Sequence, residues 1–265
     1  MQISPQLAKA KVFCIANQKG GVGKTTTAIN LAASLSQANR RVLLIDLDPQ
    51  GNATMGSGID KAAVEKNLYH VLIGESPISE AIASASSAGY DVLPSNRELS
   101  GAEIDLVDME SRERQLSEAL ASSDKQYDYV LIDCPPTLSL LTLNGLAAAN
   151  GVIIPMQCEY FALEGLSDLV NTVKRVHRNI NPNLSLIGLL RVMFDGRVTL
   201  QQQVSAQLEA HFGDKVFKTV IPRNVRLAEA PSYGLPGVVY DKSSRGAKAY
   251  LEFGKELIKR VENVG

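Results

Sequence analysis

The most constraining feature of the sequence is a glycine-rich loop, Lys-Gly-Gly-Val-Gly-Lys-Thr-Thr, at positions 19–26. An apolar run at 12–16 precedes it and a long helical pattern follows it, which predicts that the loop joins a strand to a helix. Glycine lets the backbone turn with its N–H groups facing inward, and the positive end of the helix dipole points to the same place. The segment therefore predicts a phosphate-binding loop between a strand and a helix.

The loop contains two lysines. Lys24 can reach the terminal phosphates of a nucleotide, and the Thr25 hydroxyl can ligate magnesium. Lys19 is unusual, because two ammonium groups in one short loop repel each other unless an anion, or a partner's anion, lies between them. Gln18 stands where the strict G-x-x-x-x-G-K-[ST] pattern has its first glycine, so the strand and helix around the loop carry the prediction. The alternative is a glycine-rich turn that binds nothing.

The order of apolar runs and amphipathic stretches predicts the fold class. Runs rich in β-branched residues alternate with helical patterns, which is typical of βα units around a parallel sheet. We expect one α/β domain over 11–265, a doubly wound, mostly parallel sheet with helices on both faces, preceded by a short extension over 1–10. The expected strands are 12–16, 42–47, 90–93, 129–133, 151–155, 184–193 and 216–221, and the expected helices are 25–37, 112–121, 138–149, 162–179, 200–211 and 247–261.

Composition limits the cellular location of the protein and the roles that its cysteines can have. The sequence has no apolar stretch of about twenty residues that would span a membrane, and its start lacks the apolar core of a signal peptide, so we expect a cytoplasmic protein. Cys14, Cys134 and Cys158 are too few and too scattered for a disulfide framework or a zinc site, and we expect them to be buried thiols.

Carboxylates follow two of the expected strands at the sheet edge that also carries the loop. Asp46 and Asp48 are two residues apart in Asp-Leu-Asp-Pro-Gln-Gly-Asn, and a spacing of two puts them on the same side of a strand. Such a pair can hold magnesium through water and orient an attacking water; the alternative is an Asp-Pro turn that only ends the strand. Asp133 ends the apolar run at 129–133, as in a Walker B strand, where it would bind magnesium through water.

Four segments carry a family resemblance. They are residues 17–26 (Asn-Gln-Lys-Gly-Gly-Val-Gly-Lys-Thr-Thr), 46–52 (Asp-Leu-Asp-Pro-Gln-Gly-Asn), 132–136 (Ile-Asp-Cys-Pro-Pro) and 221–231 (Ile-Pro-Arg-Asn-Val-Arg-Leu-Ala-Glu-Ala-Pro). With them the chain resembles the ParA/MinD class of deviant Walker A P-loop ATPases, and within it the ParA (Soj) chromosome and plasmid partitioning proteins. The resemblance covers almost the whole chain, and the missing first glycine is ordinary in that family.

The resemblance implies a role for each motif residue. It implies an ATP-driven homodimer in which Lys19 reaches the partner's nucleotide, Lys24 binds the β- and γ-phosphates and Asp48 positions the hydrolytic water. Thr25 would ligate magnesium, with Asp46 and Asp133 supporting the metal, and Pro222 and Asn224 would border the adenine. The remaining residues expected to bind ATP are Gly20, Gly21, Val22, Gly23 and Thr26.

The same resemblance implies slow ATP hydrolysis that a ParB-type partner accelerates, and ATP-dependent binding of the dimer to double-stranded DNA on the nucleoid, without sequence preference. Net charge is −1, yet residues 181–265 carry 12 basic and 8 acidic side chains, which allows a local basic patch. The leading candidates for DNA contact are Arg191, Arg197, Arg223 and Arg226, and further candidates are Lys242, Arg245 and Lys248. Each of them is alternatively a plain surface charge or an ion-pair partner.

Three other functions fit a loop of this kind. A MinD-like ATPase would bind membrane through an amphipathic C-terminal helix, but acidic residues interrupt the polar face of the expected last helix, which favours a helix packed on the core. An electron-transfer ATPase resembling the nitrogenase iron protein would need paired cysteines for an iron–sulfur cluster, and only Cys134 lies near the nucleotide motifs. A small-molecule kinase would need an acceptor site, which the sequence does not reveal.

Overall fold

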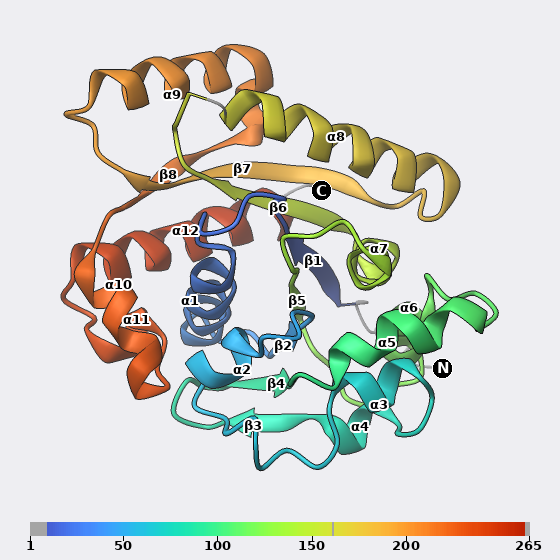
Figure 1. Ribbon diagram of the computed structural model, residues 1–265. Coiled ribbons are helices and arrows are strands. Elements are labelled where there is room, and N and C mark those ends of the chain that lie inside the picture. The colour runs from blue at the N-terminus through green and yellow to red at the C-terminus, as the bar shows by residue number, and fades with distance from the viewer. Residues whose placement is uncertain (1–9, 161, 263–265) are drawn as a thin grey trace, which may run out of the picture.

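The computed structural model describes residues 10–160 and 162–262, and its centre is a sheet of eight strands in the order β3-β4-β2-β5-β1-β6-β7-β8 (Figure 1). The strands are β1 (Lys11–Ile15), β2 (Val42–Asp46), β3 (Ala83–Ala85), β4 (Tyr90–Leu93), β5 (Tyr129–Asp133), β6 (Gly151–Met156), β7 (Ser185–Phe194) and β8 (Val216–Pro222). Every pairing is parallel except that of β3 with β4. The phosphate-binding loop follows β1, which lies between β5 and β6.

The longer helices are α1 (Lys24–Gln37), α6 (Gln115–Ala121), α7 (Leu140–Ala148), α8 (Ala162–Asn179), α9 (Thr199–Phe212) and α12 (Arg245–Glu262). Shorter ones are α2 (Asn52–Gly56), α3 (Leu68–Leu72), α4 (Ile78–Ala81), α5 (Leu99–Asp105), α10 (Val225–Glu229) and α11 (Gly237–Tyr240), with 3₁₀ turns η1 (Leu106–Asp108), η2 (Gly213–Lys215) and η3 (Ala230–Tyr233). The loops after the parallel strands meet at one edge of the sheet, where ligands bind in open α/β folds.

Helices cover both faces of the sheet because the central strands are apolar on both sides. All residues of β2, β5 and β6 are buried. Alternate residues of β1 belong to two separate cores: Cys14 packs with residues of α7 and α8, and Phe13 packs with residues of α1 and α12. Figure 1 shows α8 and α7 on one side and α1 and α12 on the other. This arrangement confirms the predicted single doubly wound α/β domain.

The sequence predicted seven of the eight strands within two residues of their observed ends, and the six longer helices within three. It did not predict β3 or the helices α2, α3, α4, α5, α10 and α11; except for α5, these helices have only four or five residues, too few for a clear period. Cys14, Cys134 and Cys158 are buried free thiols, as expected. Residues 1–9 of the expected extension lie outside the described residues.

The edge strand β8 has side-chain partners for several backbone groups. Glu256 of α12 accepts hydrogen bonds from the backbone N–H groups of Lys218 (2.7 Å) and Thr219 (2.9 Å). Arg191 of β7 donates through Nη2 to the carbonyl oxygens of Phe217 (2.8 Å) and Lys218 (3.4 Å). The register between β7 and β8 shifts at Arg191, and these side chains satisfy the backbone groups that the shift would leave unpaired.

The last helix, α12, packs on the core. The residues that it buries include Tyr250, Phe253 and Leu257, and the Tyr250 hydroxyl lies 3.0 Å from Thr27 Oγ1 in the first turn of α1. Its end is fixed by Glu262, which accepts two hydrogen bonds from Arg40 and one from the Tyr129 hydroxyl. The predicted core-packing helix is therefore confirmed. Among the described residues, no helix combines the length and the apolar character that crossing a membrane requires.

Candidate functional site

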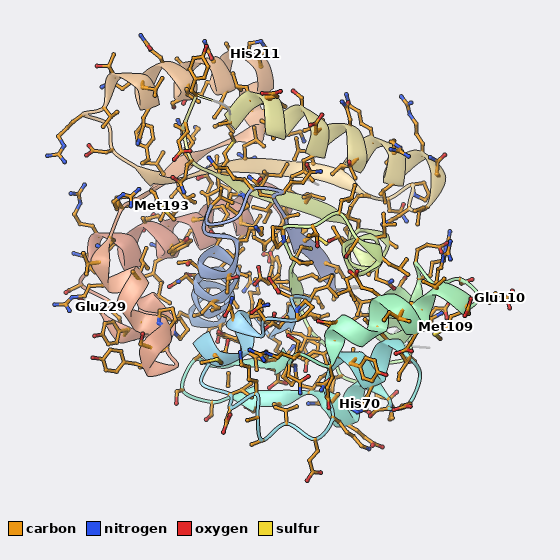
Figure 2. All side chains as sticks on the ribbon, in the orientation of Figure 1. His70, Met109, Glu110, Met193, His211 and Glu229 are labelled. Carbon is orange, nitrogen blue, oxygen red and sulfur yellow. The ribbon has the colours of Figure 1, made fainter. Side chains whose placement is uncertain are left out.

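The glycine-rich loop begins directly after β1 and ends at the first residue of α1. Gly21 and Gly23 have φ angles of 72° and 75°, in the left-handed region where a Cβ atom is strained. Gly23 also lies against β7, since a Cβ placed there would be 3.8 Å from side-chain atoms of both Val192 and Met193. Figure 2 labels Met193 on this side of α1. The glycines are therefore required by the turn itself.

Lys24 lies within the loop. Its side chain folds back so that Nζ donates a hydrogen bond to the carbonyl oxygen of Lys19 (3.1 Å), and the residue is only 8% exposed. Burial lowers the pKa of Lys24, while the charge of Asp133 opposes the shift. A partly desolvated ammonium that donates to a carbonyl gains by exchanging that carbonyl for an anionic phosphate oxygen.

Lys19 points away from the loop. Its side chain is 55% exposed and its ammonium forms an ion pair with Glu159, in the segment after β6. The backbone around it is fixed on both sides: the Lys19 N–H donates to Asn17 Oδ1 (3.0 Å), and Gln157 Nε2 donates to the Gly21 carbonyl (3.0 Å). The two lysines thus occupy different environments, one within the loop and one at the surface.

Thr25 and Asp133 form the centre of a possible magnesium site. Thr25 Oγ1 donates to Asp133 Oδ2 across 2.7 Å, and Asp133 Oδ1 is buried without a hydrogen-bond partner among the described residues. Burial, with the nearby charge of Asp46, raises the pKa of Asp133 well above its usual range. An orphaned carboxylate oxygen beside a hydroxyl at the foot of a phosphate loop is the donor set that a hydrated Mg²⁺ prefers. The residues present therefore fit magnesium.

Asp46 and Asp48 differ in their surroundings. Asp46 is fully buried; its Oδ2 accepts hydrogen bonds from the backbone N–H and the hydroxyl of Thr54 (both 2.7 Å), and its Oδ1 accepts one from the Asp48 N–H (3.3 Å). Burial raises the pKa of Asp46 to about 6. Asp48 is half-buried and accepts one hydrogen bond from the Gln50 N–H (2.9 Å). Asp46 thus ties the start of α2 to β2, a contact that sequence reasoning missed, and Asp48 remains accessible.

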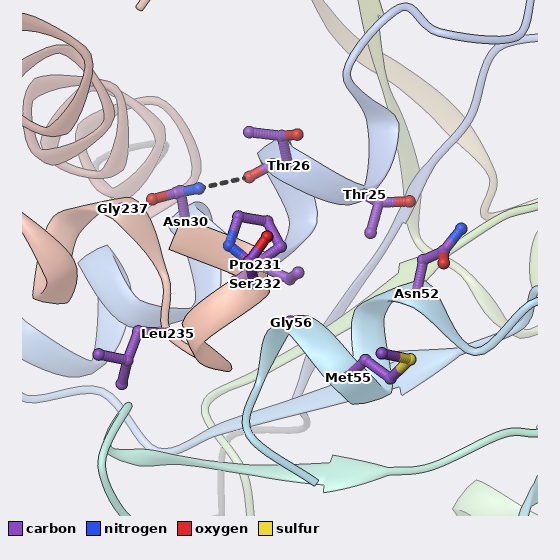
Figure 3. A pocket seen from close by; sticks show the side chains of 11 residues that line it. Thr25, Thr26, Asn30, Asn52, Met55, Gly56, Pro231, Ser232, Leu235 and Gly237 are labelled. Atoms are coloured by element: carbon purple, nitrogen blue, oxygen red, sulfur yellow. Dashed lines mark hydrogen bonds between the residues drawn. The ribbon is translucent and has the colours of Figure 1, made fainter. Parts of the chain in front are cut away.

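A pocket of about 350 Å³ opens beside the loop (Figure 3). It lies between the first turns of α1, the helix α2 and the segment from η3 to α11. Its lining residues are Thr25, Thr26, Ile29, Asn30, Asn52, Met55, Gly56, Pro231, Ser232, Leu235 and Gly237. Asn52 and Pro231 belong to motifs quoted from the sequence, but the other residues from α2 and η3 carry no signal that would have placed them beside α1.

The two residues predicted to border the adenine do not line this pocket. Pro222 ends β8 and is paired with Phe194 of β7. Asn224 caps α10, accepting a hydrogen bond from the Leu227 N–H (3.3 Å) on its side-chain oxygen. Both lie at the carboxyl end of β8, which β6 and β7 separate from the strand that carries the phosphate loop. They remain candidates for contact with a base above the ends of β7 and β8.

The structure overturns the prediction that Arg191 contacts DNA. The residue is 7% exposed, and besides the two β8 carbonyls its guanidinium donates to Ser205 (2.7 Å) and to Glu209. The charge count could not reveal this, because burial depends on packing between β7, α9 and β8. The other three candidates, Arg197, Arg223 and Arg226, are exposed.

Two of the exposed arginines form ion pairs. Arg197 pairs with Asp195 in the loop before α9, and Arg226 pairs with Glu229 (2.9 Å) and lies 3.5 Å from Asp241. All three arginines follow the ends of β7 or β8, which are neighbouring strands in the sheet. Three of the four predicted DNA-contacting residues thus share one region of the surface.

The strand, glycine-rich loop, helix and paired acidic strand ends define a P-loop nucleotide-binding protein, and a family model described as an AAA domain matches residues 10–186. The chain is 51% identical over 255 residues to the chromosome-partitioning ATPase Soj of Thermus thermophilus, covering 96% of this chain and 98% of that protein. It is 50% identical over 250 residues to the chromosome partitioning protein ParA of Myxococcus xanthus, covering 94% and 88%. The chain belongs to the ParA/Soj family of chromosome-partitioning ATPases.

A solved structure gives the same fold with ligands bound. Cobyrinic acid a,c-diamide synthase from Mycobacterium smegmatis, with bound ATP analogue and magnesium, superimposes with a TM-score of 0.84 at 38% identity, covering 96% of each chain. That protein therefore holds a nucleotide and magnesium on a closely similar scaffold.

Proposed function

We propose that this chain is an ATP-switched DNA-partitioning protein: ATP binding with Mg²⁺ assembles a homodimer that binds double-stranded DNA without sequence preference, and hydrolysis releases it. The observation that carries the proposal is the separation of the two loop lysines. Lys24 is buried within the loop, where a phosphate of its own nucleotide would lie, and Lys19 is exposed and directed outward. This difference supports a role within the subunit for Lys24 and a role between subunits for Lys19.

Each residue of the loop has a role in this proposal. Lys24 binds the β- and γ-phosphates, and the backbone N–H groups of Gly20, Gly21, Val22, Gly23 and Thr26 surround the phosphate oxygens. Thr25 would ligate Mg²⁺, and Asp46 and Asp133, which end neighbouring strands, would support the metal from behind that ligand. When bound, Mg²⁺ neutralises charge on the phosphate oxygens.

Hydrolysis depends on Asp48. Its partly exposed carboxylate, fixed by the Gln50 N–H, orients the water that attacks the γ-phosphate. Lys19 and Lys24 are the basic residues of the sequence segment 17–26. So small a positive charge in this segment fits a slow reaction that a ParB-type partner accelerates. Pro222 and Asn224 border the adenine from the end of β8.

DNA binding uses the exposed arginines that follow β7 and β8. A dimer doubles the number of phosphates that Arg197, Arg223 and Arg226 can neutralise, and because each phosphate contact releases counterions, doubling them makes binding strongly dependent on dimerisation. This switch places the ATP form on the nucleoid within the cytoplasm.

The test is binding to random-sequence double-stranded DNA at one salt concentration, with ATP and magnesium, with ADP, and without nucleotide. Binding that occurs with ATP and magnesium, but not with ADP or without nucleotide, supports the proposal. Equal binding in all three conditions would reduce the arginines to an unswitched electrostatic surface. The R223A/R226A double variant should bind ATP normally and show a smaller salt slope, and an unchanged slope would remove these two residues from the interface.

A further inference from the structure

Asp195 holds Arg197 in a two-point ion pair in the loop between β7 and α9. Arg197 Nε donates to Asp195 Oδ1 (2.9 Å) and Nη2 donates to Oδ2 (2.7 Å), and the Arg197 backbone N–H also donates to Oδ1 (3.0 Å). These contacts use one edge of the guanidinium. The other edge, formed by Nη1 and the second N–H of Nη2, is not used by Asp195, and the arginine side chain is 89% exposed.

Hydrogen bonds also connect the backbone of the loop that carries this pair to residues of the loop and of α9. The Val198 N–H donates to the Asp195 carbonyl (3.0 Å), the Asp195 N–H donates to Gln201 Oε1 (2.7 Å), and Gln202 donates to the Gly196 carbonyl. The hydrogen bonds from Arg197, with the charge of Arg245 adding to them, hold the pKa of Asp195 below its ordinary value. The carboxylate is thus ionised at physiological pH and fixed in place.

A guanidinium held on one edge can bind a second anion on the other. The group is planar and has five N–H donors in a rigid fork, which matches the spacing of two phosphate oxygens. A free arginine side chain loses much rotamer freedom when it binds, whereas one already held by a carboxylate has lost that freedom beforehand. Such an arginine binds a phosphate with less entropic cost.

We propose that Asp195 is a positioning residue for DNA binding, which orients Arg197 so that its free edge meets a phosphate of double-stranded DNA. The assignment rests on the proposed DNA-binding function. It has a counterintuitive consequence, because Asp195 is negatively charged and lies close to where a phosphate would bind. Charge alone predicts that removing this carboxylate strengthens DNA binding, whereas positioning predicts that it weakens binding.

The experiment measures binding of the full chain with ATP and Mg²⁺ to random-sequence double-stranded DNA, by fluorescence anisotropy over a salt series. The variants are D195N, R197A, the D195N/R197A double variant and R197K. D195N keeps a side-chain oxygen that accepts the Arg197 N–H, so the turn is preserved while the charged pair is lost. We expect D195N to weaken binding about fivefold, with no further effect in the R197A background.

The matched control is D128N. Asp128 makes the same set of contacts with Arg41, accepting from its backbone N–H (2.7 Å), Nη2 (3.1 Å) and Nε (3.4 Å), but at the opposite edge of the sheet, where β2 and β5 begin. The D128N substitution therefore removes the same charge as D195N, from an equivalent exposed ion pair. D128N should leave DNA affinity within about twofold of the unsubstituted chain, because that edge is distant from the arginines.

Four outcomes would overturn the assignment. Tighter binding by D195N would show that the carboxylate only repels DNA. An equal effect of D195N with and without Arg197 would show that the two residues act independently. R197K keeps the charge but not the fork, so binding by R197K equal to that of the unsubstituted chain would exclude two-point contact. If the unsubstituted chain does not bind DNA with ATP, the proposed function fails and this assignment fails with it.

Discussion

Thr25 and Asp133 are joined by a 2.7 Å hydrogen bond that links the first turn of α1 to the end of β5. The two residues are far apart in sequence, but β1 and β5 pair in register with Ile15 opposite Asp133, which brings the loop after one strand to the end of the other. The second carboxylate oxygen, Oδ1, is buried and has no hydrogen-bond partner within the described part of the chain. A hydrated cation is the natural partner for it.

The first prediction concerns this oxygen. D133N should weaken Mg²⁺-dependent ATP binding by about 10- to 100-fold, because the amide cannot supply the negative charge that orients the metal's water shell. Binding of ATP without magnesium should change much less. Titration of a fluorescent ATP analogue with and without Mg²⁺ separates the two effects. An equal loss in both titrations would contradict a role in holding the metal.

The second prediction concerns the two lysines. K24Q should lose ATP binding, because Lys24 is the buried cation of the loop. K19Q should still bind ATP but should not form an ATP-dependent dimer, because Lys19 points outward. Nucleotide titration and sedimentation velocity measure the two properties separately. A K19Q variant that still dimerises with ATP would remove Lys19 from the dimer contact.

The third prediction is a pH dependence of stability that arises from Asp46. Its pKa is about 6 in the folded chain against 3.8 ordinarily, so the folded state binds this proton more tightly than the unfolded state. The contribution to stability is therefore fully present below about pH 4 and is lost as the pH rises to about 6, by about 3 kcal/mol in total.

Urea unfolding of the unsubstituted chain and of D46N across pH 4 to 7 measures this contribution. We expect D46N to be less stable, since its amide nitrogen cannot accept the hydrogen bond that Asp46 Oδ1 accepts from the Asp48 N–H. The decisive quantity is the slope of unfolding free energy against pH, which should be less negative in D46N. Identical slopes would show that Asp46 does not titrate in this range.

The fourth prediction follows from the correction at Arg191. R191M should lower the free energy of unfolding by about 2 to 4 kcal/mol, because it leaves buried carbonyl groups of β8 without donors and Glu209 without its partner. Arg178, exposed on α8, provides the control, and R178M should change stability by less than about 0.5 kcal/mol. Equal unfolding midpoints in urea for the two variants would contradict a structural role for Arg191.

The sequence predicted the central sheet well because β1, β2, β5 and β6 are continuous apolar runs, each followed by a polar or glycine-rich turn. It also placed Thr25, Asp46 and Asp133 at one edge, since parallel strands bring their carboxyl ends together. It did not separate Arg191 from Arg197. Both are arginines in or just after β7, and only the packing of α9 and β8 buries one of them.

Contacts between distant segments were beyond local reasoning. The partner of Lys19 is Glu159, 140 residues away, and nothing near either residue marks the pair. The pocket beside α1 exists because η3, from the C-terminal part of the chain, packs against α2. In the same way, the hydrogen bonds from Thr54 to Asp46 follow from the turn at Gly51, whose φ of 65° directs α2 back to the strand.

The side chains that hydrogen-bond the backbone of β8 also affect how subunits can assemble along DNA. A strand from another molecule could continue the sheet only by pairing with backbone groups of an outer strand, yet between Phe217 and Thr219 two donors and two acceptors are already bound to Glu256 and Arg191. Displacing these two side chains would leave the buried Arg191 guanidinium without its carbonyl partners. A polymer of this protein would therefore not extend its sheet through β8, and its subunits would join through other surfaces.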